Sequence, residues 1–187
     1  MSKPAKIAVI VGSLRKDSFN RMAAKAIVAQ APAHLSFEFV EIGDLPLYNQ
    51  DFDALDPQPA PQLALREKIK GADAVLFVTP EYNRSMPGVL KNAIDVASRP
   101  WGKNVFAGKP AAVVSASISA LGGFGAHHDL KRVAGYLNMP LLNQPEVYLS
   151  SAGDLFAQDG SVKKEDTRKF LKSFVDAFDG WIQKMRG

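Results

Sequence analysis

The sequence has no cysteine among its 187 residues. The chain therefore has no disulfide, no thiolate nucleophile and no thiolate ligand for a metal. Long hydrophobic runs are also missing, because serines and glycines interrupt residues 111–126, which fall short of the roughly 20 apolar residues of a membrane helix. The apolar run at residues 7–11 is too brief for the core of a signal peptide. We therefore expect a cytoplasmic protein that does not insert into membranes.

Charge of one sign is not concentrated in any stretch, although the formal net charge is +4 and the isoelectric point is near 9.3. Basic residues are mixed with acidic ones, as at Glu67 and Lys68, and no basic stripe is interleaved with aromatic residues. We expect no nucleic-acid partner, and we attribute to the positive excess a mild preference for anionic small molecules. The length predicts one domain over residues 1–187.

Candidate metal ligands are equally sparse. Asp51, Asp53 and Asp56 resemble the start of a calcium loop, but the glycine and terminal glutamate of that motif are missing, so we expect no metal site. His34 falls in a turn and is expected at the surface. His127 and His128 begin a helical pattern, and we expect both to be exposed to solvent.

Five short apolar runs have the pattern of buried strands, and helical patterns separate them. The expected strands are residues 6–12, 37–42, 74–79, 110–117 and a segment within 141–149. The expected helices are residues 19–30, 63–70, 87–98 and 126–137, followed by a closing helix with Phe170, Phe174, Phe178 and Trp181 on one stripe. Residues 43–61 carry four prolines and are expected to be an irregular crossover. This alternation predicts a three-layer α/β fold with a five-stranded parallel sheet, and the flavodoxin-like strand order 2-1-3-4-5 fits best.

In that order, ligands bind beyond the carboxyl ends of strands one and three, where residues 12–20 and 80–85 meet. The first of these loops has hydroxyl, amide and guanidinium groups at the amino end of a helix, which favours a phosphate. Its candidate phosphate ligands are Ser13, Arg15, Ser18 and Asn20. Asp17 or Ser18 can also cap the helix. The sequence has neither the dinucleotide fingerprint nor a P-loop, so a cradle for one phosphate remains.

The second loop concentrates polar residues between Pro80 and Pro87. Prolines at both ends restrict the backbone, so we expect a stiff loop that loses little freedom on binding a flat molecule. The alternative is an ordinary strand-to-helix turn made of common turn-forming residues.

Three segments together resemble the NADPH-dependent FMN reductase family, the short flavodoxin-like quinone, azo-dye and chromate reductases. They read GSLRKDSFN, PEYNRSMPGVLKNAID and GKPAAVVSAS…LGG, and the similarity runs from Lys6 to about Leu149. The resemblance implies a single flavodoxin-like domain that binds FMN non-covalently and uses NAD(P)H as co-substrate. It also implies a homodimer or homotetramer with sites at subunit boundaries, in which the apolar stripe of the helix at residues 87–98 would face a partner.

The resemblance also assigns residues to the cofactor. Ser13, Arg15, Ser18 and Asn20 would hold the phosphate, and Pro80, Glu81, Tyr82 and Asn83 would line the isoalloxazine ring. Ser115, Ser117, Gly122 and Gly123 would close its other side. Val96 stands where the family often has an aromatic residue, which puts the pocket wall or a subunit contact there in question. Arg84 either meets a substrate carbonyl or faces solvent.

The implied activity needs no catalytic side chain, because a flavin carries the hydride chemistry itself. Backbone donors of Tyr82 and Asn83 would bond the edge of the ring. NAD(P)H would reduce the flavin and leave, and a quinone or a similar acceptor such as free FMN, an azo compound or chromate would then take two electrons. Two other functions stay open: a flavodoxin-type electron carrier without a substrate pocket, and a flavin- or nucleotide-binding regulator.

Overall fold

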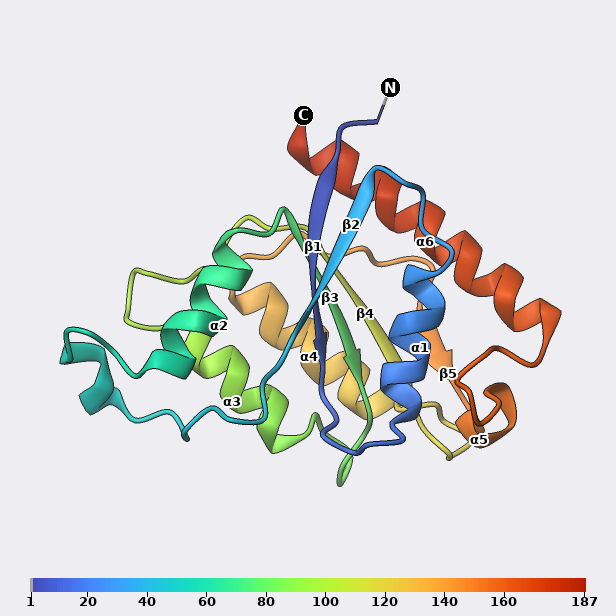
Figure 1. Ribbon diagram of the computed structural model, residues 1–187, viewed down its shortest axis with the longest axis horizontal. Coiled ribbons are helices and arrows are strands. Elements are labelled where there is room, and N and C mark those ends of the chain that lie inside the picture. The colour runs from blue at the N-terminus through green and yellow to red at the C-terminus, as the bar shows by residue number, and fades with distance from the viewer. Residues whose placement is uncertain (1) are drawn as a thin grey trace.

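Five parallel strands form the central sheet of the computed structural model, which describes residues 2–187 (Figure 1). The strands are β1 (Ala5–Val11), β2 (Leu35–Val40), β3 (Ala74–Thr79), β4 (Ala111–Ala116) and β5 (Val147–Leu149). Their order across the sheet is β2-β1-β3-β4-β5, which confirms the predicted flavodoxin-like arrangement. β3 and β4 are buried along their whole length, as their continuous apolar sequence predicts.

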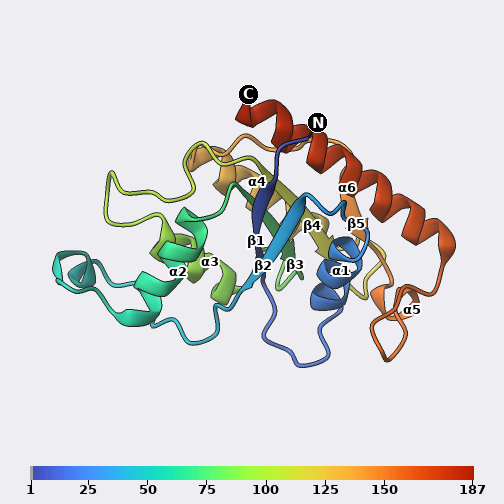
Figure 2. The ribbon, with the colours of Figure 1, turned by 45° about the horizontal axis from the view of Figure 1, so that its top comes forward.

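Helices cover both faces of the sheet (Figures 1 and 2). One face packs against α1 (Phe19–Val28) and α6 (Glu165–Arg186), and the other against α2 (Ala60–Lys70), α3 (Gly88–Ala97) and α4 (Phe124–Tyr136). Successive side chains of a strand point to opposite faces. Ile7 and Val9 of β1 therefore join the core under α1 and α6, whereas Ala8 and Ile10 join the core under α2 and α3.

The apolar stripe of α3 lies within the core of its own chain. Leu90, Ala93, Ile94 and Ala97 are buried together with residues of β1, β3 and α2, and Val96 is only 2% exposed. The expectation that this stripe faces a partner subunit was therefore wrong, because the sheet already covers it. Val96, which stands where the family often has an aromatic residue, forms neither a pocket wall nor a subunit contact, because its side chain is part of the core.

The longest helix, α6, has 22 residues and lays one apolar stripe on the sheet. Phe174 and Phe178 are 1% exposed, as the sequence predicts, whereas Phe170 is 38% exposed and lies at the margin of the stripe. Within residues 2–187, no helix combines the length and the apolarity needed to cross a membrane.

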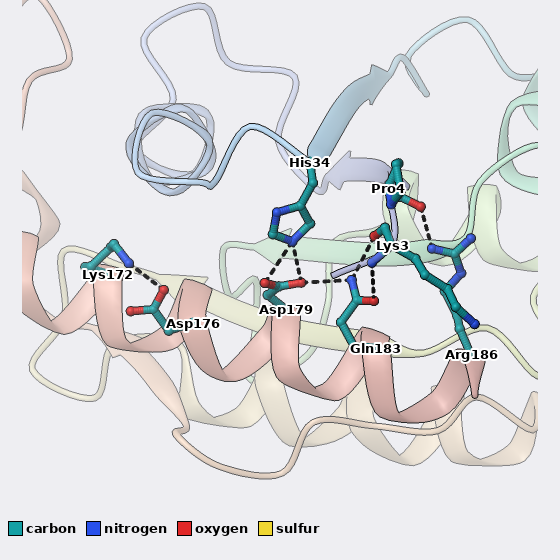
Figure 3. A network of polar contacts seen from close by, with 8 residues as sticks. All are labelled: Lys3, Pro4, His34, Lys172, Asp176, Asp179, Gln183 and Arg186. Atoms are coloured by element: carbon teal, nitrogen blue, oxygen red, sulfur yellow. Dashed lines mark hydrogen bonds and ion pairs between the residues drawn. The ribbon is translucent and has the colours of Figure 1, made fainter. Parts of the chain in front are cut away.

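Polar contacts fasten α6 to the amino-terminal segment (Figure 3). Gln183 exchanges two hydrogen bonds with the backbone of Lys3, with donor–acceptor distances of 2.9 and 3.0 Å. Arg186 donates to the carbonyl of Pro4, and His34 Nε2 lies 2.9 Å from Asp179 Oδ2. His34 is thus a partly buried partner of α6 rather than a free surface residue. These contacts lie near the amino ends of β1 and β2, away from the end of the sheet where a ligand is expected (Figure 1).

Two short elements were not predicted. A 3₁₀ helix, η1 (Gln50–Ala54), interrupts the crossover after β2, and a one-turn helix, α5 (Ala152–Leu155), follows β5. Among residues 2–187, no three histidine or acidic side chains gather in a way that could hold a metal ion.

Candidate cofactor site

Three loops follow the carboxyl ends of β1, β3 and β4 at the lower edge of the sheet in Figure 1. They comprise residues 12–18, 80–87 and 117–123. The first two leave adjacent strands whose crossovers run in opposite directions, because β1 lies between β2 and β3. This is the switch point at which open α/β sheets bind ligands.

The loop after β1 presents backbone donors at the amino end of α1. Ser18 is the N-cap of α1, and its Oγ accepts a hydrogen bond from the N–H of Arg21 at 3.3 Å. From Ser13 to Asn20, the only backbone N–H with a partner among the described residues is that of Arg15, which lies 3.4 Å from Ser13 Oγ. The other N–H groups are free to bind an anion, which the helix dipole also favours.

Gly12 lets this loop pass close to its neighbours. Its N–H donates to the carbonyl of Val78 at 2.9 Å, and a Cβ at this position would lie 3.0 Å from Leu90 and 3.1 Å from Thr79 Oγ1. Any larger residue would push the loop away from β3. Glycine is therefore needed here for close packing, and it sets the position of the donors that follow.

Arg15 supplies a positive charge beside these donors. Its guanidinium carbon lies 5.5 Å from the centre of the Phe19 ring, and the side chain is exposed. Within the described part of the chain Arg15 has no ion-pair partner, whereas Arg21 is paired with Glu41 at 2.9 Å. Of these two arginines, Arg15 is therefore the one available to an incoming phosphate.

Asn20 has a different position from the one expected of a phosphate ligand. Its side chain is 4% exposed and exchanges two hydrogen bonds with the backbone of Ala116, one to the carbonyl at 3.0 Å and one from the N–H at 3.2 Å. The side-chain amide therefore joins the first turn of α1 to the end of β4. This bond sets the distance between the first and third loops.

The loop after β3 contains a tight turn. The backbones of Tyr82 and Ser85 exchange two hydrogen bonds, and both central residues have positive φ angles, 51° for Asn83 and 68° for Arg84. This is the backbone geometry of a type I′ turn, for which asparagine is favoured and arginine is not. The N–H of Tyr82 is used inside the turn, so of the two donors expected in this segment only that of Asn83 remains available to a ligand. The N–H groups of Asn83 and Arg84, at the tip, have no partner among the described residues.

Glu81 fastens this turn to the start of α4. Its Oε2 accepts a hydrogen bond from the N–H of Ala126 at 3.1 Å, and its Oε1 lies 3.3 Å from Arg84. Gly125 permits the contact, because a Cβ there would lie 2.6 Å from the Arg84 carbonyl oxygen and 2.9 Å from Glu81 Oε2. The side chain of Arg84 is 75% exposed and, like that of Tyr82, reaches towards solvent. The carboxylate of Glu81 thus supports the turn from behind.

The loop after β4 depends on two glycines. Gly122 and Gly123 have φ angles of 59° and 84°, and a Cβ on either would lie 2.9 Å from neighbouring atoms. Ser115 is fully buried and donates to the carbonyl of Gly122 at 2.7 Å. Ser117 Oγ accepts from the N–H of Ser119 at 3.2 Å. Ser115 therefore holds the shape of this loop from inside, and Ser117 shapes its next turn.

Comparison with known proteins identifies the family. A model of the NADPH-dependent FMN reductase family matches residues 5–154. The chain is 52% identical over 186 residues to a quinone reductase of Pseudomonas putida, covering 100% of this chain and 99% of that protein. It is 50% identical over 181 residues to a 2-hydroxy-1,4-benzoquinone reductase of a Burkholderia species, covering 97% and 98% of the two chains. The chain belongs to the NADPH-dependent FMN reductase family.

A solved structure agrees with this membership. The flavoenzyme NAD(P)H:(acceptor) oxidoreductase FerB of Paracoccus denitrificans is 46% identical and superimposes with a TM-score of 0.90, covering 97% of this chain and 98% of that one. The flavodoxin-like fold and the family resemblance predicted from the sequence are both confirmed.

One cluster beside the glycine loop of this FMN reductase family member was not predicted. His127 is 2% exposed and its ring lies 4.6 Å from that of Tyr148, between centroids, whereas His128 is exposed and its Nε2 lies 2.9 Å from the Tyr148 hydroxyl. The expectation that both histidines are solvated was wrong for His127. Its Nδ1 is buried without a hydrogen-bond partner in the described structure. The pair of histidines directly after GGFGA was the available signal, but their spacing alone does not say which one is buried.

Burial lowers the pKa of His127 to about 4, with a further contribution from the charge of Lys131. In the unfolded chain this ring takes up a proton near pH 6.5, whereas in the folded protein it stays neutral down to about pH 4. The free energy of unfolding should therefore fall by up to about 3 kcal/mol as the pH is lowered from 7 to 4. Urea unfolding at several pH values measures this change. His127→Leu should flatten the profile, and equal profiles for the wild type and this variant would contradict the assignment.

The buried amide of Asn20 gives a second prediction. Asn20→Ala leaves the N–H and the carbonyl of Ala116 buried without partners, so we expect a loss of about 2–3 kcal/mol in the free energy of unfolding. The matched control is Asn49→Ala, which removes an exposed cap of η1 and should cost about 1 kcal/mol or less. Urea midpoints that agree for the two variants would show that Asn20 does not join α1 to β4.

Proposed function

We propose that the protein is an NAD(P)H-dependent, FMN-containing oxidoreductase that reduces quinones in a two-step exchange. The observation that carries the proposal is the set of free backbone donors with Arg15 at the start of α1, next to the turn of residues 82–85, in a chain 52% identical to a quinone reductase. Free FMN, azo compounds and chromate are further candidate acceptors, because an open flavin site accepts many oxidants.

The residues fit the cofactor. A single phosphate needs several donors and a positive charge, and the loop after β1 offers free N–H groups between Ser13 and Asn20 together with Arg15. We assign the phosphate to Ser13, Arg15 and Ser18, and we assign Asn20 to positioning the loop. Backbone supplies most of the donors, so the site needs few charged side chains.

The ring of the flavin is assigned to the other two loops. Pro80, Glu81, Tyr82 and Asn83 form one wall, with the N–H groups of Asn83 and Arg84 as donors to the polar edge of the ring. Ser117, Gly122 and Gly123 form the second wall, and Ser115 supports it from inside. The bound flavin supplies the hydride chemistry. Donors at the turn tip favour the negative charge that develops on reduction, so no side chain of this chain has to act as acid or base.

Arg84 is placed at the open edge of this site. Its side chain is 75% exposed and is held loosely at 3.3 Å from Glu81, so it is free to reach a substrate carbonyl. We propose this contact in preference to a purely solvated role, because the residue keeps an unfavourable positive φ of 68° at the tip of the turn.

A steady-state assay tests the function. The protein purified with FMN should oxidise NADH or NADPH rapidly when 1,4-benzoquinone is present, and parallel lines in double-reciprocal plots should reveal the two-step exchange. The alternative is an electron carrier, which would keep its flavin but show no such oxidation. The named relatives favour the reductase. A bound flavin with no turnover by any acceptor would instead favour a regulator.

We also propose that the protein works in the cytoplasm, where NAD(P)H is available, as a homodimer or homotetramer. Support for an oligomer comes from large apolar side chains that lie open on the isolated chain, with Leu47 and Trp101 79% exposed and Tyr136 78% exposed. Trp101 and Tyr136 also line a cleft of about 650 Å³ together with Tyr48 and Arg99. Sedimentation equilibrium should give two or four times the mass of the chain, and Trp101→Glu should lower it.

A further inference from the structure

A second cleft lies beside the phosphate loop, between the first turns of α1 and the segment that follows α5. Figure 2 shows these two segments at the same end of the molecule. Its volume is about 780 Å³, within the range of small-molecule sites. Arg15 and Asp17 belong to both the phosphate loop and the lining of this cleft. The cleft therefore adjoins the site proposed for the FMN phosphate, and none of residues 82–85 lines it.

Two aromatic rings and a thioether line the cleft. Phe156, which is 3% exposed, belongs to the core under α1 and is rigidly packed, while Phe19 and Met22 come from α1 and are partly buried. Flat heteroaromatic rings stack well on such side chains, and stacking on an aromatic side chain tolerates any base. This lining suits a nucleobase better than it suits an inorganic ion.

Positive charge meets this apolar lining. Lys163 lines the cleft together with Arg15, and the only hydrogen bond of its ammonium group in the described structure is a long one of 3.4 Å to the carbonyl of Gly153. Neither Lys163 nor Arg15 has an ion-pair partner among the described residues. Asp17 is the one acidic residue of the lining. The adjoining groove has three basic residues, Lys16, Arg21 and Lys25, and two acidic ones, Asp17 and Asp159. The balance of charge therefore favours an anionic group next to the aromatic rings.

We propose that this cleft binds the adenosine phosphate end of a dinucleotide, with the base against Phe19 and Met22 and a phosphate held by Lys163. The inference rests on the proposed function, because Arg15 joins the cleft to the phosphate loop. Two dinucleotides carry the required group. One is NADPH, whose adenosine 2′-phosphate would meet Lys163, and the other is FAD, whose adenylate would extend from the flavin phosphate into the cleft.

Calorimetric titration of adenosine 2′,5′-bisphosphate into the protein loaded with FMN, which leaves the cleft open, tests the proposal. We expect saturable binding that Lys163→Gln weakens about tenfold, with no change in FMN content. The matched control is Lys164→Gln, which removes the same charge from the next residue, outside the cleft, and should alter binding less than twofold. Equal effects of the two substitutions, or no binding to the wild type, would overturn the proposal.

A second set of measurements distinguishes FAD from NADPH as the dinucleotide that places its adenosine phosphate in the cleft. If the cleft takes the adenylate of FAD, the apoprotein should bind FAD more tightly than FMN, and Lys163→Gln should abolish the difference. If it takes the adenosine end of NADPH, the apoprotein should show no preference for FAD, while Lys163→Gln should raise the KM for NADPH but not for NADH. Failure of the proposed function is recognised separately, because the protein would then show no oxidation of NAD(P)H by 1,4-benzoquinone, whereas failure of the cleft leaves that oxidation intact and the bisphosphate unbound.

Discussion

Replacing Gly125 by alanine should displace the turn of residues 82–85 and weaken FMN binding by at least about tenfold. The added Cβ would lie 2.6 Å from the carbonyl oxygen of Arg84 and 2.9 Å from Glu81 Oε2, and the first of these is a backbone atom that cannot rotate away. Either the turn or the start of α4 must move. Overpacking of this kind costs about 1–3 kcal/mol in the free energy of unfolding. Fluorescence titration of the apoprotein with FMN measures the binding, and urea unfolding measures the stability.

Gly135 provides the matched control within the same helix. A Cβ at Gly135 meets nothing within 4 Å, so Gly135→Ala should leave FMN binding unchanged and stabilise α4 by about 0.5–1 kcal/mol. Unaltered FMN affinity in Gly125→Ala, with its stability lowered as expected, would show that the turn of residues 82–85 has no part in holding the cofactor.

Loss of the Arg15 charge should reduce FMN affinity by about 10-fold to 100-fold, the range expected for a hydrogen bond to a charged group. Arg15 is the better test of the phosphate site than Ser18. The Ser18 side chain also caps α1, so Ser18→Ala would lower helix stability by about 1 kcal/mol as well. Arg15 is exposed and makes no ion pair within the described chain, so Arg15→Ala should leave the fold intact.

The neighbouring Lys16 serves as the control for Arg15. Lys16 is exposed and carries the same charge as Arg15. Lys16→Ala therefore lowers the positive electrostatic potential near the phosphate site by the same unit charge as Arg15→Ala, but it removes no proposed contact with FMN. We expect its FMN affinity to stay within about threefold of the parent, as for a screened surface charge. Equal losses in the two variants would mean that only the general field attracts the cofactor.

The strands could be predicted because their apolar runs are continuous and bounded by turn-forming residues. β3 was predicted with the bounds it has in the structure, Ala74–Thr79, and the strand order followed from the alternation of strands and helices. The short elements η1 and α5 lack such a signal. Their few residues are organised by tertiary contacts rather than by a repeating pattern.

The three loops of the site were found from the sequence, but the roles of several side chains in them were not. Asn20 and Glu81 look like ligands because they are polar and stand in the right loops. Their partners, the backbones of Ala116 and Ala126, are 96 and 45 residues away along the chain. The sequence around Asn20 or Glu81 does not indicate hydrogen bonds to partners so far away along the chain. The positive φ of Arg84 was hidden for a related reason, since arginine is not a residue that marks a type I′ turn.

The proposed function requires FMN at the site formed by the three loops, where an electron donor can reach it. The visible absorption spectrum of the purified protein, recorded before and after anaerobic addition of NADPH, tests this requirement most directly. We predict the absorption band of an oxidised flavin, which bleaches when NADPH is added. A protein that takes up no flavin after incubation with FMN, or a bound flavin that NADPH leaves oxidised, would contradict it.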